Sequence, residues 1–379
     1  MPHPPVDRVR ARPRGRGARG LRLAMRSIRL ALEAGEGRPD RIVPAFRRAR
    51  VLLGEHGFGA REIRRLNLLD AGHDGRAVTA LTRAQMCAIS EALNPADARG
   101  EVGRKDRFAA ACARHGLPVP RLLAIHRGTR AGSVRDEATT GARSAGAGDG
   151  RSWLDRLGAD AFVVKPAVSG YGRDVRVCER VGPSRFRDAR GVRLDGDALL
   201  AWMDDVGGRH GCVIQERVHN HAAIEQLSGS RYLQTVRFYT LLDRTGTPRL
   251  LHAYFKLIAG DNFIDNFRAG DTGNLLALPD LEDGMLGPAL APDRRGRLVE
   301  VRRHPDTGAR IDGIRLPDWA AARALAFEAA RAFAPLRLVG WDVAIGPDGP
   351  ILIEGNWNSD PPNPGGRMAR VIADIRRWA

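Results

Sequence analysis

The stretch Gly340–Asp360, GWDVAIGPDGPILIEGNWNSD, is the part of the chain from which the fold can be argued. Two short runs of alternating character, Trp341–Ile345 and Ile351–Trp357, flank the sequence Pro-Asp-Gly at positions 347–349. These residue types suit a three-residue hairpin loop, which needs two right-handed positions followed by a left-handed one. The stretch therefore predicts a β-hairpin.

This hairpin brings two carboxylates together. A loop centred on Asp348 places Asp342 directly across from Glu354, with Asn356 two residues further along the same face. Two carboxylates about 5 Å apart repel each other unless a positive charge lies between them. Oxygen ligands from Asp, Glu and Asn suit a hard cation such as magnesium. A metal site and a surface hairpin whose acids meet some of the many arginines both remain open at this point.

The composition is that of a globular protein. The chain has 379 residues, of which 43% are hydrophobic, and no run of eighteen apolar residues, so no membrane span is predicted. Arginines but no apolar segment stand at the N-terminus, which does not resemble a secretory signal. The four cysteines are scattered and lack CxxC spacing, which is typical of a reduced, cytoplasmic protein without structural zinc.

The net charge of +17 comes almost entirely from arginine, because the chain contains only the lysines Lys105, Lys165 and Lys256. A chain that uses arginine so widely is expected to keep lysine where a compact point charge on phosphate is needed, although chance retention is the alternative. Between Arg8 and Arg29 the arginines face a single nearby acid, Asp7. This arm could bind nucleic acid or an acidic surface, or it could be a disordered leader.

A second pattern indicates phosphate binding. A buried strand predicted over Ala161–Pro166 carries Lys165, the sequence Ser-Gly-Tyr-Gly follows at positions 169–172, and a returning strand is expected at Asp174–Glu179. Small residues let backbone N–H groups close around phosphate oxygens, while the lysine supplies charge. The lysine precedes the glycines and no helix follows, so this is not a P-loop. The pattern predicts a flap that covers phosphates.

The order of the segments makes the interpretation specific. Lys105 lies in a helix predicted over Glu101–His115, a strand over Val213–Val218 follows the phosphate loop, and Arg237 and Lys256 lie on two further strands. In this order the segments resemble the ATP-grasp superfamily. The blocks TVRFYT, FKLIAGDNFIDNF and GWDVAI…LIEGNW look like its sugar-transfer-associated branch, which is related to glutamate-ligase-like enzymes. The resemblance covers residues 101–358, about two thirds of the chain.

The resemblance implies an α+β class, with two α+β subdomains that clasp ATP and a small helical region before them. Strands and helices indeed mix in the sequence without regular βαβ alternation. We expect a disordered basic arm over residues 1–20, a helical region over 21–95, an N-terminal and central subdomain over 96–212 with an insertion at about 130–151, and a C-terminal subdomain with the metal site over 213–379.

The resemblance also implies a role for each group of residues. By motif, the ATP-binding positions are Lys105, Lys165, Ser169, Gly170, Tyr171, Gly172, Gln215, Glu216 and Val218. The cationic positions beside the transferred phosphate are Arg237 and Lys256, and the ligands of one or two Mg²⁺ ions are Asp342, Glu354 and Asn356. The acid that usually holds the ribose has no clean counterpart after Val218, where Asn220 or Glu225 could serve. The loop Gly260–Asn274, with Asp265, is either a substrate lid or a solvated loop.

The activity implied is that of an ATP- and Mg²⁺-dependent ligase, which joins a small-molecule carboxylate to an amine through an acyl phosphate. The branch name points to sugar-linked substrates and cell-surface polysaccharide biosynthesis. A phosphotransferase acting on a hydroxyl and a non-catalytic nucleotide sensor remain alternatives, although the metal trio speaks against the sensor. A basic nucleic-acid-binding protein is a further alternative, against which the aromatic content of 6% counts.

Overall fold

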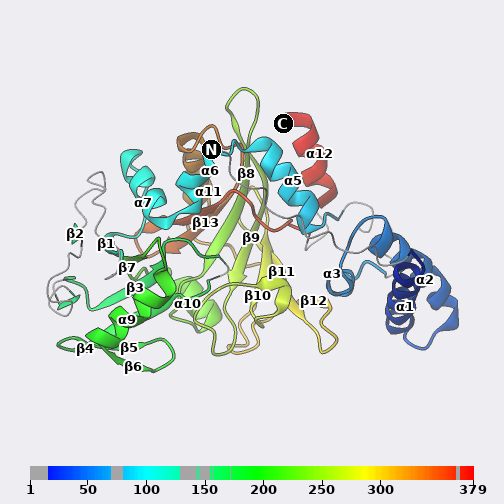
Figure 1. Cartoon of the computed structure of the whole chain (residues 1–379), viewed down its shortest axis with the longest axis horizontal. Coiled ribbons are helices and arrows are strands. Elements are labelled where there is room, and N and C mark those ends of the chain that lie inside the picture. Colours follow the sequence, from blue (N-terminus) through cyan, green and yellow to red (C-terminus); the bar gives the residue numbers. More distant parts are fainter. Residues whose placement is uncertain are drawn as a thin grey trace, which may run out of the picture. The chain divides into compact units, whose positions relative to one another are not determined.

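The computed structural model describes residues 16–69, 80–128, 143–144, 154–155, 157–170, 172–363 and 368–379. The chain divides into two compact units, Met1–Thr82 and Arg83–Ala379, whose elements are labelled in Figure 1. Most of the expected basic arm (1–20), most of the expected insertion (130–151) and Tyr171 lie outside the described residues. The expected domain boundaries at residues 95 and 213 stay predictions.

Within its described residues, the first unit is helical, as the hydrophobic pattern predicted. Its helices are α1 (Arg16–Gly35), α2 (Pro39–Gly54) and α3 (Ala60–Arg65). A proline among the first residues of α2 suits that position, since its missing N–H would have no partner there. Leu30, Leu52 and Ile63, one from each helix, are buried together in a small core.

The second unit contains two seven-stranded sheets. The first has the order β2-β1-β7-β3-β4-β5-β6 and is antiparallel except for the β1–β2 pair. Its strands are β1 (Leu122–His126), β2 (Arg143–Ser144), β3 (Ala161–Pro166), β4 (Arg176–Gly182), β5 (Arg185–Asp188), β6 (Arg193–Asp195) and β7 (Cys212–Glu216). Strand β7, where the subdomain boundary was expected, pairs inside this sheet.

A helix covers one face of the first sheet. Phe162 and Val164 of β3 are buried with Leu199 and Met203 of α9 (Gly196–Gly207). Because successive side chains of a strand point to opposite faces, Lys165 belongs to the face that α9 does not cover. The sheet therefore has an apolar face under α9 and an opposite face that carries Lys165.

The second sheet is antiparallel throughout, with the order β12-β11-β10-β9-β8-β13-β14. Its strands are β8 (Thr235–Leu242), β9 (Pro248–Leu257), β10 (Leu275–Pro279), β11 (Leu286–Pro292), β12 (Leu298–Val301), β13 (Leu338–Gly346) and β14 (Gly349–Asn356). Helix α11 (Trp319–Ala332) packs on one face, where the rings of Trp319 and Phe238 lie 5.0 Å apart.

The remaining helices surround the sheets. They are α5 (Arg83–Leu93), α6 (Arg99–Gly103), α7 (Lys105–Arg114), α10 (Ala222–Ser228), α12 (Met368–Trp378) and the short 3₁₀ helix η2 (Arg268–Gly270). The single helix predicted over Glu101–His115 was wrong, because Arg104 is extended (φ −120°, ψ 121°) and separates α6 from α7. Lys105 is consequently the first residue of α7, and its backbone N–H donates to Ala167 O at 2.9 Å. The break thus places Lys105 beside the phosphate loop.

The hairpin β13–β14 has the predicted carboxylate pair but a different turn. Gly346 pairs with Gly349, which leaves a two-residue loop in place of the predicted three-residue one. A register shift between Asp342 and Val343 then restores the pairing of Asp342 with Glu354. The extra residue of this β-bulge is Ile353 on β14.

Asn94, at the end of α5, is a buried link between this helix and the hairpin. Its side-chain Nδ2 donates to Leu338 O (2.9 Å) and Trp357 O (3.0 Å). Its Oδ1 accepts from the backbone N–H groups of Arg337 (2.8 Å) and Leu338 (3.0 Å). One amide therefore ties together the start of β13 and the chain just after β14.

We expect Asn94→Ala to lower the free energy of unfolding by about 3 kcal/mol, because it leaves backbone groups unpaired in a buried position. Urea unfolding followed by circular dichroism measures this change. Glu91→Gln, at an exposed position of the same helix, is the matched control and is expected to change stability by less than about 0.5 kcal/mol. Equal stability of the two variants would contradict the structural role of Asn94.

Candidate active site

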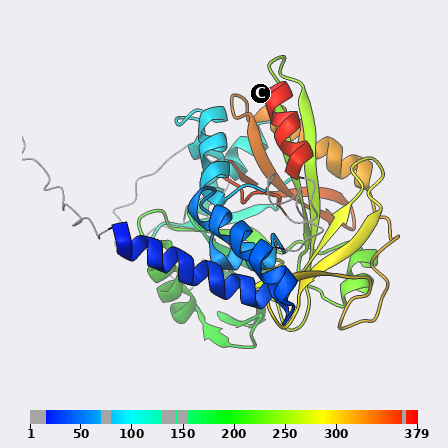
Figure 2. The same ribbon diagram turned by 90° about the vertical axis from the view of Figure 1, so that its right-hand side faces the viewer.

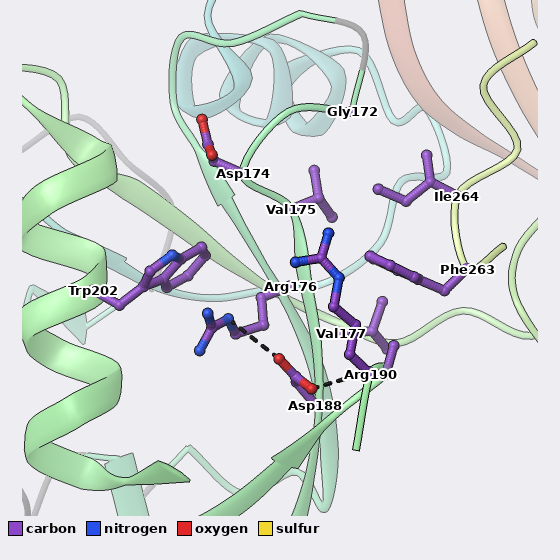
Figure 3. Close-up of a pocket in the computed structure, with 11 residues that line it drawn as sticks. Gly172, Asp174, Val175, Arg176, Val177, Asp188, Arg190, Trp202, Phe263 and Ile264 are labelled. Carbon is purple, nitrogen blue, oxygen red and sulfur yellow. Dashed lines mark hydrogen bonds and ion pairs between the residues drawn. The ribbon is translucent and has the colours of Figure 1, made fainter. Parts of the chain in front are cut away.

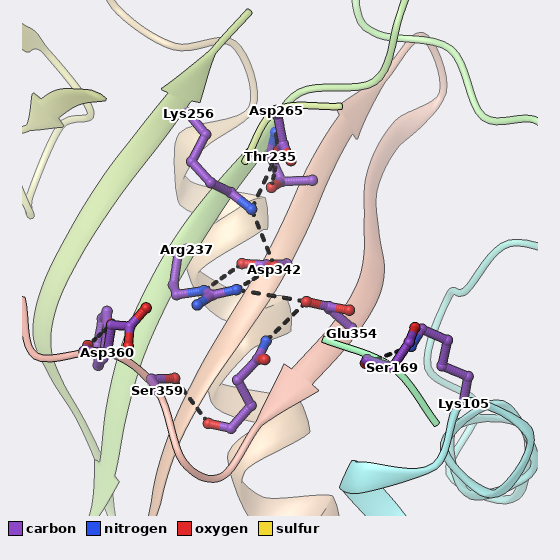
Figure 4. Close-up of polar contacts among 12 residues, drawn as sticks. Lys105, Ser169, Thr235, Arg237, Lys256, Asp265, Asp342, Glu354, Ser359 and Asp360 are labelled. Atoms are coloured by element: carbon purple, nitrogen blue, oxygen red, sulfur yellow. Dashed lines mark hydrogen bonds and ion pairs between the residues drawn. The ribbon is translucent and has the colours of Figure 1, made fainter. Parts of the chain in front are cut away.

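Polar side chains gather on the face of the second sheet that α11 leaves uncovered. Asp342 pairs across the strands with Arg237 on one side and with Glu354 on the other, so all three point to the same face. The neighbouring Phe238 and Trp341 pair on the opposite, apolar face under α11. Figure 4 shows the polar set together with Lys256. The alternation of side chains along the strands therefore produces one apolar face and one charged face.

Asp342 is the centre of this set, and its side chain is only 4% exposed. Arg237 donates to both of its oxygens, from Nε to Oδ1 and from Nη2 to Oδ2, each at 2.6 Å. Lys256 Nζ also donates to Oδ2, at 3.2 Å. Burial alone would raise the pKa of Asp342, but the charges of Arg237 and Lys256 outweigh it and hold the pKa well below its usual range. The carboxyl is therefore ionised at neutral pH.

Lys256 is shared between two carboxylates. Its Nζ lies 3.3 Å from Asp265 Oδ2 as well as 3.2 Å from Asp342 Oδ2. Burial tends to lower the pKa of Lys256, but Asp265 and Asp342 together raise it above the ordinary value. Asp265 is fixed in turn by Thr235, whose backbone N–H (2.9 Å) and hydroxyl (2.5 Å) both donate to Oδ2. Asp265 is therefore part of the charged network, a role that the sequence did not reveal.

The loop Gly260–Asn274, for which the sequence left a substrate lid and a solvated loop open, combines exposed residues with internal hydrogen bonds. The buried Asn274 donates to the carbonyl oxygens of Ile264 (2.8 Å) and Asn266 (3.0 Å) and accepts from Ala259 N (3.1 Å). Asn262 also bonds within the loop, to Ala259 O and Thr272 O. These bonds hold Asp265 against Lys256. The lid interpretation stays a prediction.

Asp342, Glu354 and Asn356 supply only part of the oxygen ligands that a hard cation needs. Glu354, whose side chain is 36% exposed, lies 3.6 Å from Arg237 Nη2 and accepts from Asn356 Nδ2 at 3.1 Å. Both oxygens of Asp342 already accept from Arg237, so Glu354 and Asn356 have the greater free capacity. Among the described residues, no group of three or more His, Cys, Asp or Glu side chains could hold a metal. Oxygens from a bound phosphate would therefore have to complete the coordination.

The two remaining lysines are close enough to Glu354 for its charge to affect their pKa values. Lys105 Nζ donates to both the carbonyl and the hydroxyl oxygen of Ser169, each at 3.1 Å. Burial lowers the pKa of Lys165 to about 8, and the nearby charge of Lys105 adds to this effect while Glu354 opposes it. Burial also lowers the pKa of Lys105, again opposed by Glu354. Glu354 is thus within electrostatic reach of the phosphate loop and of Arg237 (Figure 4).

The predicted adenine and ribose positions are only partly brought to this place. Gln215 pairs with Val163, so it shares the face of Lys165, whereas Glu216 pairs with Phe162 and belongs to the opposite face. Glu216 binds Arg121, accepting from its backbone N–H (2.9 Å) and its Nε (3.2 Å). This is the ion-pair role that competes with adenine binding.

Asn220, one of the two residues considered for the ribose, is committed elsewhere. Its amide donates to Tyr232 O and accepts from Gln234 N, each at 2.8 Å. The other, Glu225, lies in the first turn of α10. Gly170 is exposed and Val218 is half-buried, and Tyr171 lies outside the described residues.

The phosphate loop touches the loop that carries Asp265. A Cβ added at Gly172 would lie 2.8 Å from Ile264 Cγ2, and the backbone of Gly172 is left-handed (φ +62°). Both facts require glycine here. Figure 3 shows Gly172 and Ile264 at the rim of a cavity of about 100 Å³. This volume is below the roughly 300–1,000 Å³ of small-molecule sites, so we assign no ligand to the cavity.

Comparison with known proteins identifies the family. A family model described as sugar-transfer associated ATP-grasp matches residues 88–363, which are 276 of the 379 residues. The chain belongs to the sugar-transfer associated ATP-grasp family. This ATP-grasp chain therefore has the α+β fold that the sequence predicted, preceded by a helical N-terminal region. A comparison with curated proteins gave no match.

Solved structures similar to the ATP-grasp chain have low sequence identity. Biotin carboxylase from Campylobacter jejuni, in a β,γ-ATP complex, is 11% identical over 94% of this chain and 69% of that one, with a TM-score of 0.43. D-cycloserine synthetase DcsG is 18% identical over 78% and 79%, with a TM-score of 0.37.

The biotin carboxylase domain of the Hydrogenobacter thermophilus 2-oxoglutarate carboxylase is a further similar structure. It was determined with MgADP, ADP and bicarbonate and is 13% identical over 74% of this chain, with a TM-score of 0.38. This chain covers 47% of the length of that one.

Proposed function

We propose that this ATP-grasp protein is an ATP- and Mg²⁺-dependent ligase that activates a carboxylate as an acyl phosphate and joins it to an amine. The observation that carries the proposal is the arrangement of Arg237, Lys105 and Lys165 around Glu354, which we call the cation frame. Arg237 lies on one side of this carboxylate, at 3.6 Å. Lys105 and Lys165 are close enough on the other side for its charge to affect their pKa values. Such a frame suits a polyphosphate whose negative charge must be neutralised during transfer.

The proposed roles follow from the positions of the side chains. Lys105 and Lys165 would hold phosphates of ATP under the loop formed by residues 169–172. Arg237 and Lys256 would stabilise the transferred phosphoryl group, since they lie on the same sheet face as Glu354. Asp342 would act on the phosphates indirectly, by holding Arg237 and Lys256 in place. Gln215 and Val218 would contact the adenine, and Glu216 would do so only if it left Arg121.

Glu354 and Asn356, with Asp342, would hold the Mg²⁺. When bound, this ion supplies charge neutralisation and fixes the geometry of the phosphates. Substrates that carry sugars and a role in cell-surface polysaccharide biosynthesis are part of the same proposal, and they rest on the family's association with sugar transfer. A cytoplasmic site of action is also proposed. It is supported by four cysteines that form no disulfide and by the finding that no described helix is long and apolar enough to cross a membrane.

The test is ADP release from Mg·ATP in the presence of a panel of sugar acids, with hydroxylamine as the amine. A ligase forms an acyl phosphate and ADP; hydroxylamine then displaces phosphate, so hydroxamate and phosphate appear in equal amounts. We expect Glu354→Gln to lower this rate by at least about 100-fold, because it removes a charged metal ligand. Glu328→Gln, at an exposed position of the helix α11 that covers the opposite face of the sheet, is the matched control.

Two outcomes would contradict the ligase. ADP formed without hydroxamate or phosphate, together with a phosphorylated hydroxyl compound, would identify a phosphotransferase instead. Mg²⁺-dependent ATP binding without any ADP release across the panel would favour a nucleotide sensor.

A further inference from the structure

The first helix of the protein exposes an apolar stripe. Leu21, Met25, Ile28 and Leu32 of α1, which we call the apolar stripe, are 64%, 62%, 48% and 55% exposed. Their spacing of four, three and four residues puts them on one side of the helix. A different side of α1 is buried: it carries Ser27, Leu30 and Ala31, of which the last two share a core with residues of α2 and α3. Figure 2 shows α1 beside α2.

Arginines border the apolar stripe. At 100° per residue, Arg22, Arg26 and Arg29 follow one another along the edge between the stripe and solvent, and all three are exposed. Glu33, the only acid of α1, is already bound to Arg29 (3.1 Å) and Arg64 (2.5 Å). The exposed surface of α1 is therefore apolar and positively charged, with its single negative charge neutralised.

This combination restricts what can cover the stripe. An antiparallel pair of α1 helices packed stripe to stripe would bring both arginine edges to the same seam, where like charges repel. A nucleic acid would neutralise the arginines but leave four large apolar side chains in water. An anionic membrane surface satisfies both, because the apolar side chains enter the acyl boundary while guanidinium groups stay at the lipid phosphates.

We propose that α1 docks the protein on the surface of a bilayer containing anionic lipids. The helix lies in the plane of the interface and does not span the bilayer: the apolar stripe is inserted, and Arg22, Arg26 and Arg29 contact phosphate groups. The proposal concerns the first unit alone and is independent of the activity proposed for the second. It gives the exposed stripe a partner that matches both its apolarity and its charge.

The test is flotation of the full-length protein with two kinds of vesicle, phosphatidylcholine alone and phosphatidylcholine mixed with phosphatidylglycerol. We expect binding to the anionic vesicles only, weakened by salt because the arginine contribution is screened. The double variant Met25→Glu/Ile28→Glu is expected to bind at least about tenfold more weakly, since it places charges in the acyl region. Arg22→Gln/Arg26→Gln should also bind more weakly and lose much of the salt dependence.

Val43→Glu is the matched control, because Val43 is 55% exposed on α2 and lies outside the stripe. It should bind as the wild type does, and circular dichroism should show that all variants are folded. The proposal is overturned if the wild type does not float, or if Met25→Glu/Ile28→Glu floats equally well. It is also overturned if that variant instead dissociates a dimer in size-exclusion chromatography, which would assign the stripe to a second copy. Loss of thermal stability in that variant, without vesicle binding by the wild type, would assign the stripe to the protein's own second unit.

Discussion

Replacing Asp342 by alanine is expected to lower the free energy of unfolding of the second unit by about 3–5 kcal/mol. The side chain of Asp342 is 4% exposed and is the shared partner of Arg237 and Lys256, which are themselves 13% and 9% exposed. Removing it leaves two cations nearly buried, with only Asp265 and the more distant Glu354 nearby. Urea unfolding with an unchanged denaturant slope measures the loss.

Glu354→Ala is the matched variant on the neighbouring strand. Its side chain is 36% exposed, lies 3.6 Å from Arg237 and accepts one hydrogen bond from Asn356, so we expect less than about 1 kcal/mol of destabilisation. Both variants should lose nucleotide turnover, but only Asp342→Ala should lose stability. If the two variants lose the same stability, Asp342 is not the structural centre of the site.

The way in which the stabilising contribution of Asp342 changes with pH can also be tested. Its pKa is lowered in the folded protein, so its contribution is fully present above the unfolded pKa of about 4 and is lost as the pH falls below that value. The stability difference between the wild type and Asp342→Asn should therefore shrink on acidification. A difference that grows below pH 4 would contradict the ion-pair network.

Replacing Lys165 by methionine is expected to weaken ATP binding by about 10- to 100-fold, the value of one charge-assisted hydrogen bond. The affinity of the wild type for ATP should depend on pH, because the pKa of Lys165 is about 8. Below pH 8 the amine is charged and ready for phosphate. Above it the free protein has lost the proton, so affinity should fall as the pH rises.

Calorimetry separates this effect from a general pH effect. ATP phosphates stabilise the charged amine, so above pH 8 binding to the wild type should take up close to one proton, which appears as a dependence of the heat on buffer ionisation. Lys165→Met should take up none from this site. Because the folded protein buries Lys165 more favourably as a neutral amine, the free energy of unfolding of the wild type should increase relative to that of Lys165→Met as the pH rises from 8 to 10.5. Proton uptake that is the same in both proteins would show that another group titrates.

The site could be predicted where one chemical pattern lies within a short stretch. The pair Asp342 and Glu354 was correct because alternation along the hairpin determines which residues share a face. The predicted three-residue turn was wrong, because the loop has two residues. The β-bulge at Ile353 compensates for this difference of one residue, and nothing in the local sequence marks the bulge. The shorter turn and the unpredicted bulge change the register in opposite directions, so the carboxylate pair was predicted correctly although its turn was not.

Long-range contacts could not be predicted from local patterns. Arg237 is 105 residues from the Asp342 that it binds, and Asp265 reaches Lys256 from a loop with no regular structure. The strands β5, β6 and β10–β12 were not predicted either. They are short and most of them contain Arg or Pro, for example RFRD in β5 and LLALP in β10, so their sheet partners rather than their own propensity determine them.

The chain has three lysines, and the structure places all of them at one site. We therefore expect amine-reactive reagents, which label the surface of most proteins, to react here at the proposed active site and at the α-amino group. Burial lowers the pKa of Lys165 to about 8, so a substantial fraction of its amine is neutral and reactive near neutral pH. Protection of Lys165 from labelling by ATP would then be a footprint of nucleotide binding. Immobilising this protein through its amines would, for the same reason, block the site that one wishes to measure.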